Sequence, residues 1–243
     1  MKDNIDIYWG GYMSLKHSEL AIIKPVPLFK EIYNNISKKD LDKESLKNYQ
    51  LYFKCPAAKK EHENIFAVKA PREFSFEWDP KLKKYSSKYI TNPQILKQFL
   101  FVRGGAMASL GYFNYFFSEE NIEMSQLPAY YNENNFVNSV FLTSGKYNIS
   151  KWFRHVDPSF IMKKNKIDIK RGDTLFYVKF HTNKKVNLKN FNVTKGILDF
   201  AKKTTDLKLF EKNLALEKMY KIFCSRSLNK RILKEIKNNL TDY

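Results

Sequence analysis

The sequence predicts a β-rich α+β fold, in which a β-sandwich or jelly-roll-like domain carries an N-terminal helix and a helical C-terminal extension. Three observations support this prediction. Apolar and polar residues alternate along several short segments of the middle third, which is the period of a strand. Turn-forming residues separate these segments about every eight to twelve residues, as in sandwiches and barrels. After residue 193, apolar residues recur at helical spacing instead.

The most regular stretch of the chain runs from Phe136 to Thr182. Its first segment, Phe136–Thr143, alternates and is expected to form a strand. Arg171-Gly172-Asp173 is a turn signal, and Thr174–Phe180 after it is the clearest strand of the sequence. Further short strands are expected at residues 147–154, 160–162 and 167–169.

Helical and extended segments alternate before this stretch. Apolar residues four apart predict a helix from Leu28 to Ile36. Asp40–Asn48 is expected to add a helical turn or two, and Tyr49–Phe53 is expected to be extended. Ile65–Lys69 and Phe74–Trp78 have the pattern of two strands paired through a short turn.

The predicted domain organisation divides the chain at residue 194. Residues 1–193 form the β-sandwich or jelly-roll-like domain with its N-terminal helical insertion, and residues 194–243 form a basic helical extension packed on it. In the last predicted helix, Leu228, Ile232, Ile236 and Leu240 lie on one side. The opposite side carries Lys230, Arg231, Lys234 and Lys237.

The formal net charge of +18 has two explanations. A basic protein attracts nucleic acid or another polyanion, so the four basic residues of the last helix are candidate nucleic-acid contacts. However, only six of the 43 basic residues are arginine, and Asn, Ile, Tyr and Phe are abundant as well. AT-rich codons favour all of these residues, so a low-GC genome alone would produce much of the charge. In that case, the basic side of the helix is simply a solvated face.

The composition also bears on the compartment. Met1–Asp6 has no apolar segment of the kind found in a signal peptide, so export by that route is not expected. Phe99–Phe117 is apolar, but its glycines favour two strands over a membrane span. Cys55 and Cys224 lie far apart and do not suggest a disulfide framework, which suits a reducing cytoplasm. Pro56 is expected to open a short helix, whose dipole would lower the pKa of the Cys55 thiol.

One group of three residues is a candidate metal site. His155, Asp157 and His181 match the residue types of a 2-His-1-carboxylate iron site. In this respect the sequence resembles the iron(II)/2-oxoglutarate oxygenases, and the resemblance implies iron as the cofactor. The gap between the histidines is short for that family, and no arginine follows His181 to hold a co-substrate carboxylate. No other catalytic residues are predicted, and without this site no cofactor is expected.

A second candidate site is an aromatic loop. Pro128, Tyr130 and Tyr131 lie in the polar stretch Gln126–Asn135 between two predicted strands. Tyrosines in an exposed loop are typical of a contact surface. The alternative is that this loop covers one end of the β domain.

Several phrases resemble a family of uncharacterised proteins of marine T4-like tailed phages. They include Phe53–Ala57, Phe116–Glu120, Pro128–Tyr131, Gly145–Arg154 and Asp173–Phe180. The resemblance implies a phage accessory protein in the host cytoplasm or the virion, and no catalytic residues.

Three functional hypotheses follow. The first is a non-enzymatic accessory protein that binds an unknown host or virion protein. The second is a nucleic-acid-binding protein that uses the last helix. The third is an iron-dependent oxygenase that uses the two histidines and the aspartate. No membrane partner is expected.

Overall fold

The computed structural model describes residues 3–13, 22–37, 43–104, 107–210 and 215–241. Their helices are α1 (Leu28–Ser37), α2 (Lys43–Lys54), α3 (Pro56–His62), α4 (Pro93–Phe99), α5 (Asn135–Ser139), α6 (Lys195–Phe210), α7 (Leu216–Ser225) and α8 (Leu228–Lys237). Their strands are β1 (Asn4–Met13), β2 (Val26–Pro27), β3 (Ile65–Lys69), β4 (Phe74–Asp79), β5 (Lys84–Ser86), β6 (Leu100–Gly104), β7 (Met107–Leu110), β8 (Tyr112–Ser118), β9 (Glu123–Leu127), β10 (Val140–Leu142), β11 (Gly145–Asn148), β12 (His155–Val156), β13 (Ser159–Met162), β14 (Lys166–Ile169), β15 (Thr174–His181) and β16 (Lys185–Asn190). The prediction of a β-rich α+β fold is confirmed.

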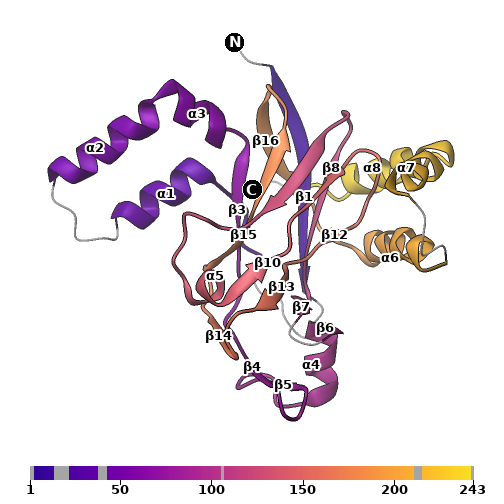
Figure 1. The fold of residues 1–243 in the computed structure, drawn as a ribbon. Helices are drawn as coiled ribbons and strands as arrows, with labels where there is room; N and C mark the ends of the chain where they lie inside the picture. The colour runs from indigo at the N-terminus through magenta and orange to yellow at the C-terminus, as the bar shows by residue number, and fades with distance from the viewer. Residues whose placement is uncertain (1–2, 14–21, 38–42, 105–106, 211–214, 242–243) are drawn as a thin grey trace.

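Two sheets share one apolar core in the middle of the molecule (Figure 1). The first sheet has the strand order β12-β8-β1-β16, with β1 parallel to β16 and antiparallel to β8. The second has the order β11-β9-β15-β3-β2. Phe116 on β8 and Phe180 on β15 meet edge to face between the sheets, with ring centroids 5.6 Å apart. This contact shows that the two sheets pack on each other through their aromatic side chains.

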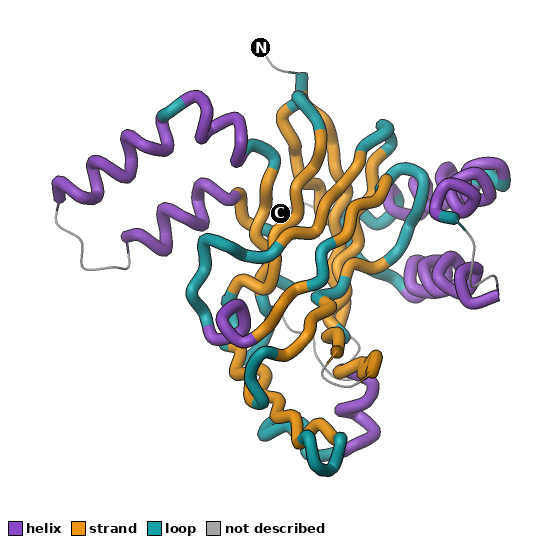
Figure 2. Tube along the Cα trace, viewed as in Figure 1, coloured by secondary structure: helices purple, strands orange, loops and turns teal. Residues whose placement is uncertain are grey.

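Helices lie on both sides of these strands, with α1 to α3 on one side and α6 to α8 on the other (Figure 2). The first sheet and the C-terminal helices share a second core, which includes Tyr8, Tyr115, Phe117, Phe153, Phe191, Ile197, Phe223, Ile232 and Ile236. The second sheet and α1 share a third, which contains Leu28, Ile32, Ile65, Ala67, Ala129 and Tyr177. Strands β8 and β15 are therefore buried on both faces, which explains their nearly continuous apolar sequences.

Two smaller sheets extend the molecule at one end. They have the orders β10-β13-β7-β6 and β14-β4-β5, and α4 lies beside them (Figure 1). Phe74 and Phe99 stack there with centroids 4.4 Å apart and belong to the main core. The two smaller sheets and α4 therefore pack into the same core as the two large sheets.

Several predicted elements are confirmed. The strand expected at Thr174–Phe180 is β15, and the turn before it has Gly172 at φ +85°, a conformation that glycine adopts without strain. The helix expected at Leu28–Ile36 is α1, and Pro56 opens α3. The short strands expected at 160–162 and 167–169 are β13 and β14.

The strand expected at Phe136–Thr143 is wrong in its first half, because residues 135–139 form α5. The side chain of Asn134 accepts a hydrogen bond from the amide of Val137 at 2.9 Å and caps this helix. Only residues 140–142 continue as a strand. The alternating pattern was misleading because a single helical turn also buries residues three apart, here Phe136 and Ser139.

Two further expectations are corrected. Residues 49–53 lie in α2 and are not extended. Strands β3 and β4 exist where predicted but do not pair with each other: β3 lies between β15 and β2, whereas β4 lies between β14 and β5. The segment between them, with Pro71 buried, leads the chain from one sheet to another. Turn chemistry alone therefore did not identify the partner strands.

Candidate functional site: a polar pocket beside helix α1

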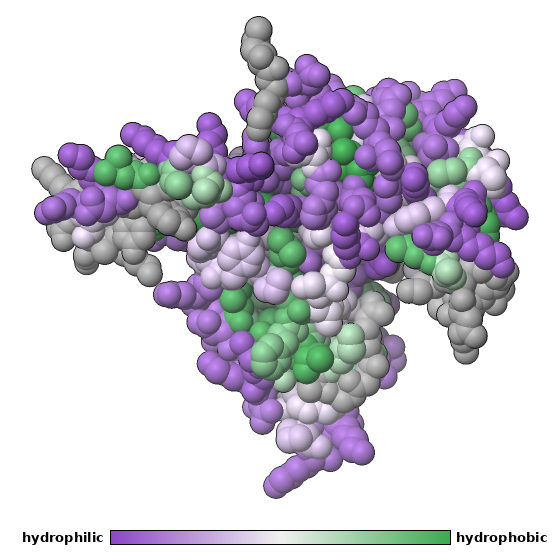
Figure 3. All heavy atoms as spheres, turned by 45° about the horizontal axis from the view of Figure 1, so that its top comes forward, coloured by the Kyte–Doolittle hydropathy of each residue, from purple (hydrophilic) through white to green (hydrophobic). Residues whose placement is uncertain are grey.

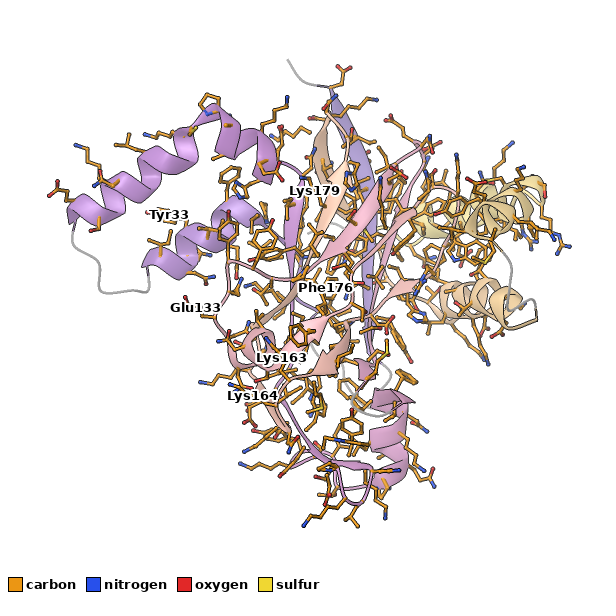
Figure 4. The ribbon with its side chains drawn as sticks, viewed as in Figure 1. Tyr33, Glu133, Lys163, Lys164, Phe176 and Lys179 are labelled. Atoms are coloured by element: carbon orange, nitrogen blue, oxygen red, sulfur yellow. The ribbon has the colours of Figure 1, made fainter. Side chains whose placement is uncertain are left out.

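A pocket of about 990 Å³ opens between α1, α2 and the loop of residues 128–134, here named the aromatic loop. In Figure 4, Tyr33 marks α1 and Glu133 marks the aromatic loop. The pocket is at the upper end of the size range of small-molecule sites, which is about 300–1,000 Å³. Its lining residues are Val26, Glu31, Ile32, Asn34, Asn35, Ile36, Ser45, Asn48, Lys69, Tyr130, Tyr131, Asn132, Glu133, Asn134, Gly172, Asp173 and Thr174.

The pocket contains a buried ionic cluster. Glu31 on α1 forms a salt bridge with Lys69 at the end of β3, and the side chains of the two residues are 3% and 12% exposed. The hydroxyl of Thr174 donates to Glu31 Oε1 at 2.7 Å, and Lys69 Nζ donates to Thr174 Oγ1 at 2.8 Å. Each of the three side chains thus has hydrogen-bond partners within the cluster, as is usual for buried polar groups. The cluster joins α1 to two neighbouring strands of the second sheet.

Local packing explains why Glu31 faces inward. Leu28 and Ile32 of α1 are buried against β3 and β15. Glu31 lies beside this apolar stripe because it is three positions after Leu28 and directly before Ile32 in the helix. The carboxylate is therefore carried under the helix, where Lys69 ends β3 and Thr174 begins β15.

The aromatic loop is held in place by side-chain hydrogen bonds. Asn132 donates to the hydroxyl of Tyr177 at 2.8 Å, and Asn134 donates to the carbonyl of Thr174 at 2.8 Å. The hydroxyl of Tyr131 lies 2.7 Å from Nε2 of His62, which is buried on α3. The loop thus presents a preformed wall to the pocket.

The two tyrosines predicted as an interaction loop lie on this wall. Tyr130 is 52% exposed and packs edge to face on Tyr177, with centroids 5.2 Å apart. Tyr131 is 39% exposed, and Pro128 is exposed at the start of the loop. Burial raises the pKa of Tyr130 above its ordinary value. Its phenolic O–H can donate a hydrogen bond to a ligand. The structure therefore brings the predicted loop residues to the edge of a pocket.

The charge of the pocket differs from that of the whole chain. Among the residues that the structure describes, its lining contains three carboxylates, those of Glu31, Glu133 and Asp173, and one amine, that of Lys69. This described lining is formally negative in a chain of net charge +18. A polyanion would meet electrostatic repulsion here, so any nucleic-acid contact must be sought elsewhere on the surface.

The structure does not assemble the predicted iron site. His155 Nε2 lies 3.6 Å from Asp157 Oδ1 on the first sheet, whereas His181 lies at the end of β15 in the second sheet. His181 Nε2 is instead 2.7 Å from the hydroxyl of Ser125. Within the described part of the chain, no three His, Cys, Asp or Glu side chains are grouped so that they could hold a metal ion.

The four basic residues predicted as nucleic-acid contacts share one exposed face of α8. The burial of Ile232 and Ile236 on the opposite face agrees with the predicted apolar side. Lys237 donates to Glu119 at 2.9 Å. The other three, Lys230, Arg231 and Lys234, form no ion pair with the described residues.

A separate apolar patch lies on the sheet β10-β13-β7-β6. Figure 3 shows hydrophobic residues gathered on the lower half of the visible face, which is otherwise largely hydrophilic. Phe141 and Ile161 are register partners on β10 and β13 and are 63% and 44% exposed. Lys163 lies over the Phe141 ring at 4.9 Å. Nothing in the structure indicates what would cover this patch.

Sequence reasoning identified the aromatic loop but missed the buried cluster. Glu31, Lys69 and Thr174 are far apart in sequence. The pairing of β3 with β15 brings Lys69 beside Thr174, and the packing of α1 on these strands brings Glu31 to both, and no local pattern encodes either contact. The one available signal was the run Asn132-Glu133-Asn134-Asn135, whose amides are typical of a structured loop.

No helix among the described residues is long and apolar enough to cross a bilayer. Comparison of the chain with protein-family models found no match, and comparisons with curated protein sequences and with solved structures found none either.

Proposed function

We propose that this protein is a non-enzymatic binding protein that receives a short segment of a partner protein in the pocket beside α1. The observation that carries the proposal is the coincidence of two features. The aromatic loop singled out by its composition also forms one wall of the 990 Å³ pocket.

The lining of the pocket has the chemistry of a peptide site. A carboxamide offers one acceptor and two donors, so Asn48, which is exposed on α2, can pair with the alternating donors and acceptors of a peptide main chain. The amide of Asn35 donates to Asn132 Oδ1 at 3.1 Å and joins α1 to the aromatic loop. The aliphatic side chains of Val26 and Ile36 provide apolar contacts beside them. Tyrosine is among the residues that contribute most to protein interfaces.

The pocket is also preorganised. Asn132, Asn134 and Tyr131 fix the aromatic loop through hydrogen bonds to two elements, β15 at two positions and α3 at one. A wall that is already ordered loses little conformational entropy when a ligand binds. These contacts support a role in binding.

The resemblance to proteins of T4-like phages suggests a setting for this activity. In that setting, the partner is a host protein or a virion component, and the protein acts in the host cytoplasm or the virion. The formally negative lining favours a partner segment that is neutral or carries a positive charge.

The test is a selection of short random peptides against the immobilised protein, followed by fluorescence anisotropy of the selected peptides. We expect Tyr130→Ala to weaken their binding by about tenfold or more, as truncation of a central tyrosine does at protein interfaces. Tyr89→Ala removes a tyrosine of similar exposure, 47%, from the segment before α4 and serves as the matched control.

Asn48→Trp provides a second test, because it places a large side chain in the pocket from the exposed surface of α2. It should also block the selected peptides. The proposal fails if no peptide is selected, or if the selected peptides bind both pocket variants as tightly as the original protein.

A further inference from the structure

The last two helices form a rigid unit with a short connection. Only Arg226 and Ser227 separate α7 from α8. Ser227 adopts the left-handed conformation, with φ 54° and ψ 25°. Its amide donates to the carbonyl of Cys224 at 3.0 Å, and its carbonyl accepts from the amide of Arg231 at 3.1 Å. The second helix therefore begins directly where the first one ends.

Both helices use their apolar faces for packing. Met219 and Phe223 of α7 and Ile232 and Ile236 of α8 are buried in the core shared with α6 and the first sheet. Because these faces are occupied, the opposite faces of the two helices point to solvent. What the unit offers to a partner is its outward face.

That outward face is strongly basic. The described residues 215–241 contain seven Lys or Arg and two Glu. All seven basic side chains are exposed, namely Lys218, Lys221, Arg226, Lys230, Arg231, Lys234 and Lys237. Lys237 pairs with Glu119, so the remaining basic side chains of α8, Lys230, Arg231 and Lys234, contribute most of the uncompensated charge of this helix.

Ion pairs compensate some of the surface lysines. Lys146 lies near Glu123, Lys179 near Glu61, Lys184 near Glu120 and Lys189 near Asp6, whereas Lys84 on β5 and Lys185 on β16 form no ion pair with the described residues. On α8, in the part of the protein that the structure describes, Lys230, Arg231 and Lys234 lack such a carboxylate. On α8, three basic side chains without an ion pair among the described residues are therefore neighbours on one exposed face, while the fourth, Lys237, pairs with Glu119.

The spacing of the charges suits a nucleic-acid duplex. Lys230, Lys234 and Lys237 are four and three residues apart and follow one side of α8. With a rise of about 1.5 Å per residue they span about 10 Å along the helix axis. Duplex DNA carries one negative charge per about 1.7 Å, and its major groove, about 12 Å wide, admits an α-helix.

We infer that the outward face of α7 and α8 binds the phosphate backbone of double-stranded DNA without sequence preference. The exposed face consists mainly of lysines, which contact phosphates as point charges and read base edges poorly when mobile. Double-stranded RNA is the less favourable ligand, because its deep and narrow major groove does not admit a helix. This inference concerns a surface distinct from the pocket beside α1.

The test measures the binding of a short labelled DNA duplex by anisotropy over a series of salt concentrations. Contact by about four or five of these cations predicts a slope of log Kd against log salt of about 4. The variant Lys230→Gln/Arg231→Gln/Lys234→Gln should lower that slope by about 2 to 3, because each lost phosphate contact removes about 0.9.

A variant of equal charge change controls for the general positive charge of the chain. Lys81→Gln/Lys83→Gln/Lys84→Gln neutralises three exposed lysines of the β4–β5 hairpin, which Figure 1 places at the opposite end of the molecule from α8. We expect it to leave the slope nearly unchanged. Circular dichroism should show that both variants remain folded, since all six side chains are exposed.

Several outcomes decide the inference. Two unrelated duplex sequences should bind equally well, and the α8 variant should retain the peptide binding expected of the pocket. Equal losses in both triple variants would show that the overall charge attracts DNA and would overturn the assignment to α7 and α8. Absence of duplex binding, or tighter binding of duplex RNA than of DNA, would overturn it as well.

Discussion

The buried pair of Glu31 and Lys69 provides the sharpest test of how the pocket is built. We consider Lys69→Met and Glu31→Gln, which keep the approximate shape of each side chain and remove its charge. Lys69→Met leaves the carboxylate of Glu31 beneath α1 with 3% of its side chain exposed and without its cation. The hydroxyl of Thr174, at 2.7 Å, remains as a neutral donor.

The expected magnitudes follow from burial. Removing one partner of a buried pair leaves an uncompensated charge and costs about 3–5 kcal/mol of unfolding free energy. Glu31→Gln should cost less, about 1–3 kcal/mol, because Lys69 is partly exposed and can reach water. The double variant buries no unpaired charge, so its loss should be smaller than the sum of the single losses by at least about 2 kcal/mol.

Urea denaturation followed by tryptophan fluorescence measures these free energies, since the chain contains three tryptophans. The surface pair Lys166 and Asp168, 3.6 Å apart and more than half exposed, is the control. Its cycle of Lys166→Met and Asp168→Asn should give a coupling below about 0.5 kcal/mol. If the buried pair shows equally small coupling, Glu31 and Lys69 do not depend on each other and the account of the pocket is incorrect.

Three further predictions concern other parts of the chain. Gly10→Ala should destabilise the protein by about 1–3 kcal/mol in urea denaturation, because the added Cβ would lie 2.7 Å from the ring of Phe191. Gly145→Ala is the control: its Cβ would have no atom within 4 Å, so the free energy of unfolding should change by less than about 0.5 kcal/mol. The Cys55 thiol is exposed, and backbone hydrogen bonds at the start of α3 lower its pKa. Iodoacetamide should therefore alkylate Cys55 faster than Cys224, the half-buried thiol of α7. Equal alkylation rates, measured by mass spectrometry, would contradict this prediction. Burial raises the pKa of Asp6 but hydrogen bonds from Lys189 and a neighbouring asparagine lower it more, so the net shift is downward. A lowered pKa in the folded state stabilises the protein at pH values above the unfolded pKa of about 3.9, and this stabilisation is lost as the pH falls through the folded pKa. Asp6→Asn should therefore reduce the urea midpoint near pH 7 and reduce it progressively less as the pH is lowered below about 3.9.

The fold class was predictable because local patterns encode it. The strand β15, the turn at Gly172 and the helices α1 and α8 each follow from residues within one element. What could not be predicted is which strands pair. Strands β3 and β4 are adjacent in sequence and have suitable turn residues between them, yet they belong to different sheets. Pairing depends on packing between distant segments, which a local reading does not contain.

The same limit applies to the candidate sites. The histidines His155 and His181 have the residue types of an iron site, but the chain places them in different sheets. Conversely, Glu31 and Lys69 have no recognisable spacing, and the packing of α1 on β3 brings them together. Residue types with motif-like spacing thus indicate chemistry only where the intervening elements bring the side chains to one place.

The positive charge of this chain cannot be interpreted from its total. The formal charge of +18 gives the same expectation for every lysine, but the structure gives lysines different surroundings. Some, such as Lys179, Lys189 and Lys237, pair with carboxylates at 2.5 to 2.9 Å. Others, such as Lys234, have no such carboxylate among the described residues. Lys84 on β5 and Lys185 on β16 are also exposed and form no ion pair with the described residues, so an uncompensated lysine does not by itself indicate binding. On α8, Lys230, Arg231 and Lys234 lie together on one face, and a cluster of like charges attracts a polyanion more strongly than a single charge does. The two charge-matched triple variants therefore compare the α8 face with another exposed group of lysines.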